Sequence, residues 1–316
     1  MNAEDWPVMF DVVLTGVGAV SPWGGKDAFF GAFGPGPATK PAAANAGPTE
    51  VPGIESAKLR SVRYMDPVAK NAIAAIEEAL ADACIAAGDV AQDPYGYGIV
   101  LAASRGPIAT REKAYEQLRA RQGKLLSGTL FSNAGYNIAA AMAAMAHGIK
   151  GPNLTVAGRC NLSLHLLRRA RQLLRSAGVH TVLAGFSESQ AEPTTAWPWA
   201  CAFCLERPER ARQRRAGGAV ALAEIEPAFP EQAPALPDGR AIRLPRPVPQ
   251  PLRPEVLAAA ETVDVGSGHS TGIGPEYLPL LHAGRVKATE GGTEHDHIAF
   301  PVRTRSGLSL LGLARV

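Results

Sequence analysis

The stretch of residues 151–186 constrains the fold of this chain more than any other part of it. Leu154–Ala157 predicts a short buried strand, Asn161–Ala177 predicts an amphipathic helix that ends before Gly178, and Thr181–Ala184 predicts a second buried strand. Because parallel strands need a long crossover connection, this order predicts two parallel strands joined by a helix.

Cys160 lies in the predicted turn between the first of these strands and the helix. The unpaired N–H groups and the positive dipole end of the helix favour a thiolate over a thiol at this position. A thiolate there is a nucleophile beside a ready-made anion site. The alternative is a small buried hydrophobic residue, and position alone leaves both interpretations open.

A specific pattern surrounds Cys160. Gly-Pro-Asn-Leu-Thr-Val is followed by three residues, the cysteine, a helix and Val-Leu-Ala-Gly-Phe. This order resembles the nucleophile region of β-ketoacyl synthases, whose pattern GPxxTV-xTA-C-SSG can be laid on this chain without a gap. Val12–Gly24 is similar to the opening strand and turn of that family, and the segment from Cys201 resembles a later strand. Gly268–Gly272 resembles the motif that carries one of the family's two catalytic histidines, so the resemblance implies Cys160 and His269 as catalytic residues.

The resemblance implies a thiolase-like α/β fold, with two similar α/β halves in five layers and a shortened C-terminal half. No sequence repeat is visible, so the two-half architecture follows from the resemblance alone. We expect a half carrying Cys160 at residues 1–226, a linker at 227–254 and a C-terminal part carrying His269 at 255–316. Nine prolines fall within residues 227–254, which argues against a helix or a central strand there.

Strands alternate with helices along the rest of the chain, which predicts an α/β fold with a largely parallel sheet. Asp66 and Pro67 begin a helix with a buried stripe of Ile73, Ile76, Leu80 and Cys84, and Gly88 ends it. Further predicted elements are a strand at Gly98–Ala103, an exposed helix at Thr110–Arg121 and an alanine-rich helix at Asn133–His147 closed by Gly148. In the C-terminal part they are helices at Glu255–Ala260 and Pro275–His282 and strands at Thr262–Val265, His297–Val302 and Leu308–Ala314.

The family's chemistry requires a nucleophile, an oxyanion hole and imidazoles, of which Cys160 and His269 are candidates here. Several features depart from the family's pattern. The HGTGT-type motif of the first catalytic histidine is absent from the sequence, Asp264 replaces the expected lysine, and residues 303–307 replace a Gly-Phe gating loop. Arg159 stands where a small residue is usual, and it either lowers the pKa of Cys160 or fills the acyl tunnel.

Two functions follow from this combination. The first is a degenerate partner subunit of an active ketosynthase, comparable with chain-length factors. The second is a Cys160–His269 acyltransferase, or a minimal β-ketoacyl synthase, that is active by itself. Both act on acyl thioesters in fatty-acid-like or polyketide biosynthesis, with an acyl carrier protein or acyl-CoA as the thioester, in a homodimer or a heterodimer with another ketosynthase.

Composition narrows the class of protein further. Hydrophobic residues make up 46% of the chain and charged residues 19%, which is typical of a globular protein, and no run of about 18 apolar residues predicts a membrane span. A net charge of +3 is too small to indicate nucleic-acid binding. Four cysteines without framework spacing and an N-terminus without a basic leader predict a reducing cytoplasm. The basic segment Arg207–Arg215 predicts a solvated surface loop, or alternatively a contact for an acidic carrier protein.

Other candidate sites are weaker, and neither a cofactor nor a metal is expected. Cys201 and Cys204 have metal-ligand spacing, but the apolar stretch Ala200–Leu205 predicts a strand that points them to opposite faces. The other candidates considered are His295-Asp296-His297 as a metal site or a solvated turn, His165 as a packing or polar-face residue, and Gly16 and Gly18 as an incomplete dinucleotide motif.

Overall fold

A computed structural model describes residues 12–21, 24–32, 65–158, 162–176, 178–188, 199–214, 220–225, 240–243, 261–264, 297–304 and 307–315. Its strands are β1 (Val12–Val20), β2 (Tyr97–Ala103), β3 (Asn153–Ala157), β4 (Thr181–Glu188), β5 (Trp199–Glu206), β6 (Val220–Ile225), β7 (Arg240–Arg243), β8 (Glu261–Asp264), β9 (His297–Thr304) and β10 (Gly307–Arg315). Its helices are α1 (Lys26–Ala32), α2 (Pro67–Asp82), α3 (Ala87–Gln92), α4 (Ile108–Ala120), α5 (Gly128–Asn133), α6 (Ile138–His147), α7 (Leu162–Leu174) and α8 (Pro208–Arg214). None of the described helices is long and apolar enough to cross a membrane.

The described strands form one hydrogen-bonded sheet in the order β3-β2-β4-β5-β1-β6-β10-β9-β7-β8. From the centre outward, each set of five strands has the same order: first, fifth, fourth, second and third. The two sets meet where Val12–Leu14 of β1 pairs with Val220–Leu222 of β6. The predicted pair of similar halves is therefore confirmed, although the amino-acid sequence shows no repeat.

The two sets of strands differ in the direction of one member. In the first set, β2 runs parallel to both β3 and β4. In the second set, its counterpart β7 runs antiparallel to both β8 and β9. β7 also lies within residues 227–254, so the expectation that prolines exclude a central strand there is wrong. The four residues Arg240–Arg243 form a proline-free run between Pro237 and Pro245, which is long enough for this short strand.

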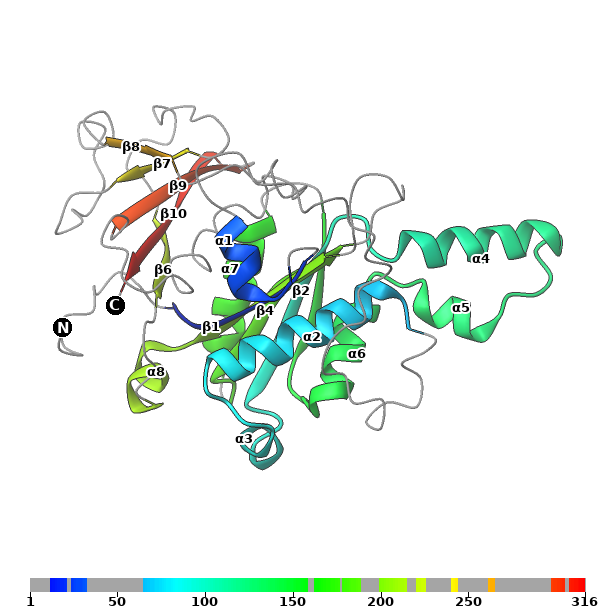
Figure 1. Ribbon diagram of the computed structural model, residues 1–316, viewed down its shortest axis with the longest axis horizontal. Helices are drawn as coiled ribbons and strands as arrows, with labels where there is room; N and C mark the ends of the chain where they lie inside the picture. The colour runs from blue at the N-terminus through cyan, green and yellow to red at the C-terminus, as the bar shows by residue number, and fades with distance from the viewer. Residues whose placement is uncertain are drawn as a thin grey trace.

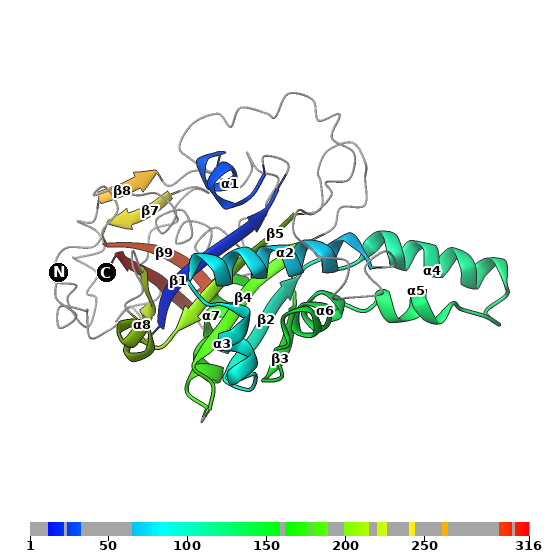
Figure 2. The same cartoon turned by 60° about the horizontal axis from the view of Figure 1, so that its bottom comes forward.

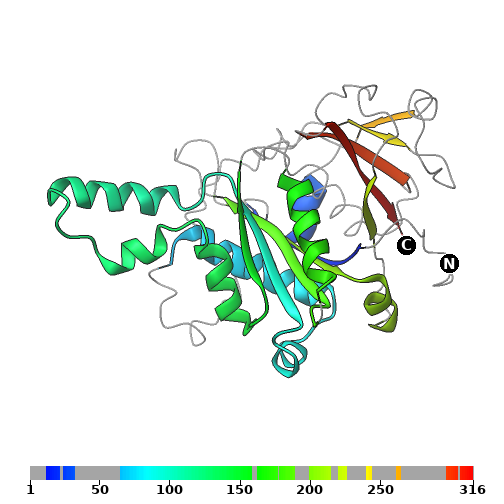
Figure 3. The same cartoon turned by 180° about the vertical axis from the view of Figure 1, so that it is seen from behind.

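Helices cover both faces of the first five strands. The core on one face joins α2 and α6 to side chains such as Leu183 and Cys204, and the core on the other joins α1 and α7 to side chains such as Val182 and Phe203. Figure 1 shows α2 and α6 in front of the sheet, and Figure 3 shows α7 from behind. The segment that includes Cys160 therefore enters a helix that packs against the second of these faces.

Gly16 and Gly18 of β1 lie where α2 crosses the sheet. An added Cβ atom would lie 2.2 Å from the carbonyl oxygen of Ala79 at Gly16 and 2.0 Å from that of Ala75 at Gly18. Only glycine permits this approach, so these residues serve helix packing and do not form a dinucleotide loop.

Two carboxylates of α2 replace a neighbouring strand along part of β1. Because β1 pairs with β6 only over Val12–Leu14, later N–H groups on that edge need other acceptors. Asp82 Oδ2 accepts from the N–H of Val17 at 2.9 Å, and Glu78 Oε2 accepts from the N–H of Ala19 at 2.7 Å. Glu78 and Asp82 are one helical turn apart, so they meet alternate residues of the strand.

The start of α2 is as predicted, whereas its end is not. Asp66 caps the helix by accepting from the N–H of Val68 at 2.9 Å, and Pro67 is its first residue. The helix ends at Asp82, and Cys84 adopts the left-handed φ of 55° and is exposed. The predicted burial of Cys84 is therefore wrong, and Gly88 lies within α3 instead of ending α2.

Two further predictions need small corrections. The alanine-rich helix α6 begins at Ile138, because the residues up to Asn133 form the separate helix α5. α6 ends before Gly148, which has φ 69°, and it packs against α2 as its small residues predict. The structure confirms the predicted strands that correspond to β2, β4, β5, β8, β9 and β10. The predicted helices Glu255–Ala260 and Pro275–His282 lie outside the described residues.

β3 forms as predicted, but it is not buried. It is the end strand of the sheet, and its residues are exposed or half-exposed, with Leu154 at 37%. Helices α4 and α5, which we call the arm (residues 108–133), project beyond the body at this end of the sheet (Figures 1 and 2). Ala114 is the one buried residue of α4, which confirms the prediction of an exposed, charged helix.

Candidate functional site

The described residues on either side of the predicted nucleophile lie at the edge of the sheet where the parallel strands β2, β3 and β4 end. β3 ends at Ala157, and the N–H of Gly158 donates to the carbonyl oxygen of Ala103, the last residue of β2, at 3.3 Å. α7 begins at Leu162, so the predicted strand before Cys160 and the predicted helix after it are confirmed. Arg159, Cys160 and His269 themselves lie outside the described residues, and their roles stay predictions.

A buried carboxylate, which the sequence did not single out, lies at the same edge. Glu188 is the last residue of β4 and is 4% exposed. Its two oxygens accept from the N–H groups of Ser104, at 2.6 Å, and Arg105, at 3.1 Å, just after β2. Both oxygens bind backbone, so Glu188 shapes the loop beside the candidate site. The available signal was a carboxylate directly after a fully buried strand.

A second group of contacts connects the first residues of α4, where the arm begins, to the residues that follow β2 and precede α2. Thr110 of α4 donates its hydroxyl to Asp66 Oδ2 at 2.5 Å, while the other carboxylate oxygen of Asp66 caps α2. The guanidinium of Arg111 lies 4.6 Å from the ring centre of Tyr136 and donates to the carbonyl oxygen of Arg105. The arm is therefore tied to the strand ends that flank the Cys160 segment.

The Cys201–Cys204 pair is structural, as predicted. The strand β5 points Cys201 into the core beneath α1 and α7 and Cys204 into the core beneath α2 and α6. Burial raises the pKa of the Cys204 thiol to about 12 and raises the pKa of Cys201 well above its ordinary value. Both thiols therefore stay protonated, and they cannot share one metal ion.

The described residues contain no group of three His, Cys, Asp or Glu side chains that could hold a metal ion. His295 and Asp296 lie outside those residues, so the tripeptide as a metal site or a turn stays untested, and His297 begins β9. His165 lies on the exposed side of α7, in agreement with the polar-face alternative.

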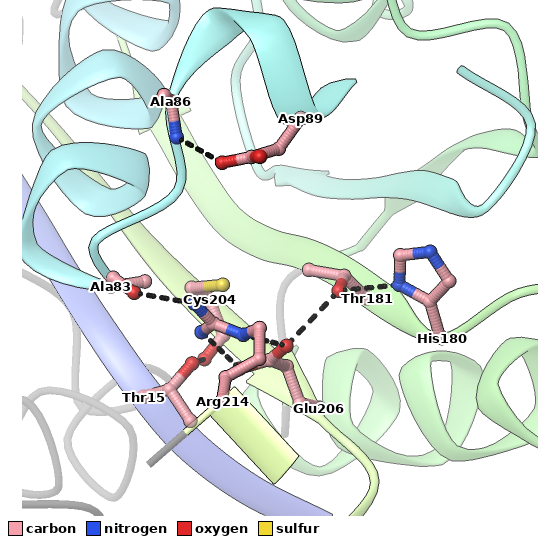
Figure 4. Close-up of polar contacts among 9 residues, drawn as sticks. All are labelled: Thr15, Ala83, Ala86, Asp89, His180, Thr181, Cys204, Glu206 and Arg214. Atoms are coloured by element: carbon pink, nitrogen blue, oxygen red, sulfur yellow. Dashed lines mark hydrogen bonds and ion pairs between the residues drawn. The ribbon is translucent and has the colours of Figure 1, made fainter. Parts of the chain in front are cut away.

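The basic segment Arg207–Arg215 is not the predicted surface loop, because most of it forms α8. Arg214 makes two bonds to Glu206, of 3.0 and 2.6 Å, and a third to the carbonyl oxygen of Ala83 at 2.9 Å (Figure 4). Glu206 is fully buried, and an uncompensated charge there would be costly, which explains why Arg214 folds inward. Arg207 donates to the carbonyl oxygen of Val179 at 2.6 Å. These two arginines are part of the fold.

Comparison with known proteins agrees with this architecture. Residues 45–220, more than half of the chain, match the family described as the β-ketoacyl synthase N-terminal domain. A curated relative, 3-oxoacyl-[acyl-carrier-protein] synthase 2 of Coxiella burnetii (strain RSA 493 / Nine Mile phase I), is 26% identical over 195 residues. That match covers 58% of this chain and 46% of the relative, so the chain spans about half the length of the curated protein it matches.

Solved structures with a similar fold have low sequence identity. The ishigamide ketosynthase/chain length factor has a TM-score of 0.59 at 18% identity, covering 97% of this chain and 99% of that one. A β-ketoacyl synthase from Burkholderia phymatum STM815 has a TM-score of 0.60 at 14% identity, covering 98% and 100%. The AntDE:AntF complex of a type II PKS acyl-carrier protein with its ketosynthase has a TM-score of 0.63 at 13% identity, covering 98% of this chain and 100% of that one. The fold is thiolase-like, as predicted, and the chain belongs to the β-ketoacyl synthase family.

Proposed function

We propose that this chain is a partner subunit of an active ketosynthase and that the pair acts on acyl thioesters in fatty-acid-like or polyketide biosynthesis. The observation that carries the proposal is the open end of the sheet at β3. Asn153–Ala157 contains neither a charge nor a proline, the usual protections of an end strand. β2 is its one neighbour among the described strands, so a strand of a second chain can extend the sheet there.

The arm supports the same proposal. Among the described elements, α4 packs substantially only with α5, and isolated helices of this length are marginal in water. Tyr115, Leu125 and Phe131 are more than half exposed on the arm, as is Met145 on the adjacent helix α6. Several large apolar side chains exposed in one region of the sequence are typical of a protein interface.

The departures from the family's catalytic pattern favour a partner role. The sequence lacks the first histidine motif and replaces the expected lysine with Asp264, and loss of residues that act as a unit lowers a rate by orders of magnitude. Structures of similar fold include ketosynthase/chain length factor pairs and a complex of an acyl-carrier protein with its ketosynthase. A ketosynthase and an acyl carrier protein are therefore the partners we propose, in a reducing cytoplasm that suits the three free cysteines described.

The association is tested by co-expressing the chain with candidate ketosynthases and measuring mass by light scattering during size exclusion. Leu154→Glu on β3 and Phe131→Glu on the arm are expected to weaken association at least about tenfold, or 1.4 kcal/mol. Tyr95→Glu is the matched control, because Tyr95 is 65% exposed but lies at the amino end of β2. A stable homodimer that never binds a ketosynthase contradicts the partner proposal.

A second candidate function, a Cys160–His269 acyltransferase, is favoured by the confirmed strand and helix on either side of Cys160. Thioester exchange needs only a nucleophile and a base. Intact-mass spectrometry after incubation with acyl-CoA or acyl-carrier thioesters is expected to show an acyl adduct that Cys160→Ala removes. Absence of the adduct across chain lengths contradicts this function.

A further inference from the structure

A chain of polar groups runs from the surface to the core at the amino end of β4, away from the Cys160 edge. His180 precedes β4, and its Nε2 lies 3.2 Å from Oδ2 of Asp93. His180 Nδ1 lies 2.9 Å from the hydroxyl oxygen of Thr181, which in turn lies 3.3 Å from Oε1 of Glu206. Glu206 is the buried partner of Arg214 (Figure 4).

The order Asp93, His180, Thr181 has the form of a catalytic triad, but it cannot act as one. Thr181 is fully buried at the start of β4, so its hydroxyl cannot reach a substrate. The hydroxyl instead lies between the His180 ring and the Glu206 carboxylate (Figure 4). It therefore links a partly exposed titratable group to a buried ion pair.

The hydrogens available in this chain of groups allow two arrangements. Thr181 has one hydroxyl hydrogen and can donate it to His180 or to Glu206, but not to both. The Asp93 carboxylate requires a hydrogen on His180 Nε2. A neutral His180 therefore carries its hydrogen on Nε2 and accepts from Thr181 at Nδ1.

Protonation of His180 reverses the second bond. Nδ1–H now donates to the hydroxyl oxygen of Thr181, and this oxygen's own hydrogen becomes available to Glu206 Oε1. Arg214 Nε donates to that same Oε1 at 3.0 Å. The state of His180 thus decides whether Oε1 accepts from Arg214 alone or also from Thr181.

We propose that His180 and Thr181 form a hydrogen-bond relay, in which protonation of His180 turns the Thr181 hydroxyl toward Glu206 and so transmits solvent pH to the buried Glu206–Arg214 ion pair. Arg214 also binds the carbonyl oxygen of Ala83 at the end of α2, and α8 leads the chain toward β6. The relay therefore acts where the chain passes from the first set of strands to the second. It does not depend on the proposed partner function.

Charged and titratable groups around His180 determine the pH at which the relay switches. They are Asp93 after α3, Tyr97 of β2, Glu206 of β5 and Arg210 and Arg214 of α8. Burial and then the charge of Arg210 lower the pKa of His180, and the bond to Asp93 opposes this. The relay therefore switches at a pH below about 6.5, the ordinary value for histidine. The side chains of His180 and Asp93 are 21% and 55% exposed, so protons can enter from solvent.

Nuclear magnetic resonance of the full chain tests the relay. Long-range ¹H–¹⁵N spectra between about pH 5 and pH 8 report the tautomer and titration of His180, assigned with His180→Gln. We expect the Nε2–H tautomer at neutral pH, and an Arg214 Nε–H signal that shifts with the same midpoint as His180. Thr181→Val should remove the Arg214 shift while His180 still titrates, and Thr181→Ser should retain it.

Three results would overturn the proposal. They are an Nδ1–H tautomer at neutral pH, an Arg214 signal that does not change with pH, and an Arg214 shift that persists in Thr181→Val, which would show an effect through space alone. The first two are measured on the unmodified chain, so either of them can overturn the proposal even if Thr181→Val does not fold.

Discussion

The two ends of the sheet differ in how they are protected. The strand β3 has the sequence Asn-Leu-Thr-Val-Ala, is parallel to its neighbour and carries no charge. At the other end, β8 has the sequence Glu-Thr-Val-Asp and is antiparallel to β7. The register pairs Arg240 with Asp264 and Arg243 with Glu261, so both acidic positions of β8 have a basic residue as their register partner. Charged end strands resist further pairing, so the comparison supports our proposal that a partner binds at β3.

The largest effect is expected at the Glu206–Arg214 ion pair, because Glu206 is fully buried on β5, which lies between the two ends of the sheet. Arg214→Ala leaves the buried Glu206 carboxylate uncompensated and should lower the free energy of unfolding by about 3–5 kcal/mol in urea titrations. Arg169→Ala is the control, because that exposed side chain binds only Gln172 in the contacts described, and roughly 0.5 kcal/mol or less is expected. A small effect for Arg214→Ala would contradict the dependence of the buried Glu206 carboxylate on this one cation.

The second prediction converts the protected end into an open one. Replacing Glu261 and Asp264 with threonine removes the charges of β8, so we expect new self-association with a dissociation constant at least about tenfold lower than that of the original chain. Analytical ultracentrifugation measures this constant. Glu77→Thr on α2 with Glu209→Thr on α8 removes the same charge at exposed helix positions, outside the arm and outside any strand. Equal self-association in both variants would show that net charge, and not edge protection, separates the two ends.

The third prediction sharpens the comparison at the open end. Iodoacetamide is expected to label exposed Cys84 far faster than buried Cys201 and Cys204. Cys160, by its predicted turn, should also label quickly. Binding of a ketosynthase should slow labelling of Cys160 several-fold and leave Cys84 unchanged, because Cys84 follows α2 at the opposite end of the strands. Peptide mapping measures each rate, and equal protection of both thiols would contradict a contact confined to the open end.

The smallest effect concerns pH. The pKa of His180 is lower in the folded chain than its ordinary value, so the unfolded chain binds the proton more readily. Stability should therefore be complete above about pH 6.5 and should decline as pH falls through the folded pKa. His180→Gln should flatten this part of the curve of urea midpoint against pH, and His165→Gln, on the exposed side of α7, should leave it unchanged.

Local signals in the sequence predicted the parts of the fold that depend on near neighbours. Asp66 and Pro67 specify the start of α2 because capping involves only the next residues. The alternation around Cys201 and Cys204 predicted opposite faces because strand geometry determines it. The family resemblance implied two similar halves, but the order of the ten strands was not predicted, since nothing local encodes which strands become neighbours.

The incorrect predictions depended on distant contacts. The apolar run Leu154–Ala157 does not indicate that its strand lies at the end of the sheet. The sequence around Arg214 likewise does not indicate that this side chain pairs with the buried Glu206. α2 ends earlier than predicted because Cys84 adopts the left-handed conformation. Glycine usually occupies that conformation at a helix end, so the sequence had indicated Gly88 as the end of the helix. At the candidate site, the strand and helix around Cys160 were predictable, whereas Glu188 became evident only once its backbone partners were known.

The carboxylates of Glu78 and Asp82 have a consequence for how such a protein can change over evolutionary time. They accept hydrogen bonds from the N–H groups of Val17 and Ala19, which therefore need no partner on β6. The strand pairing between the two sets is limited to three residue pairs of β1 and β6. Few backbone pairs therefore have to be preserved when either set of strands diverges. One set can reverse the direction of a strand, as β7 shows, while the other set keeps its geometry. The two copies of a duplicated architecture can therefore evolve different functions.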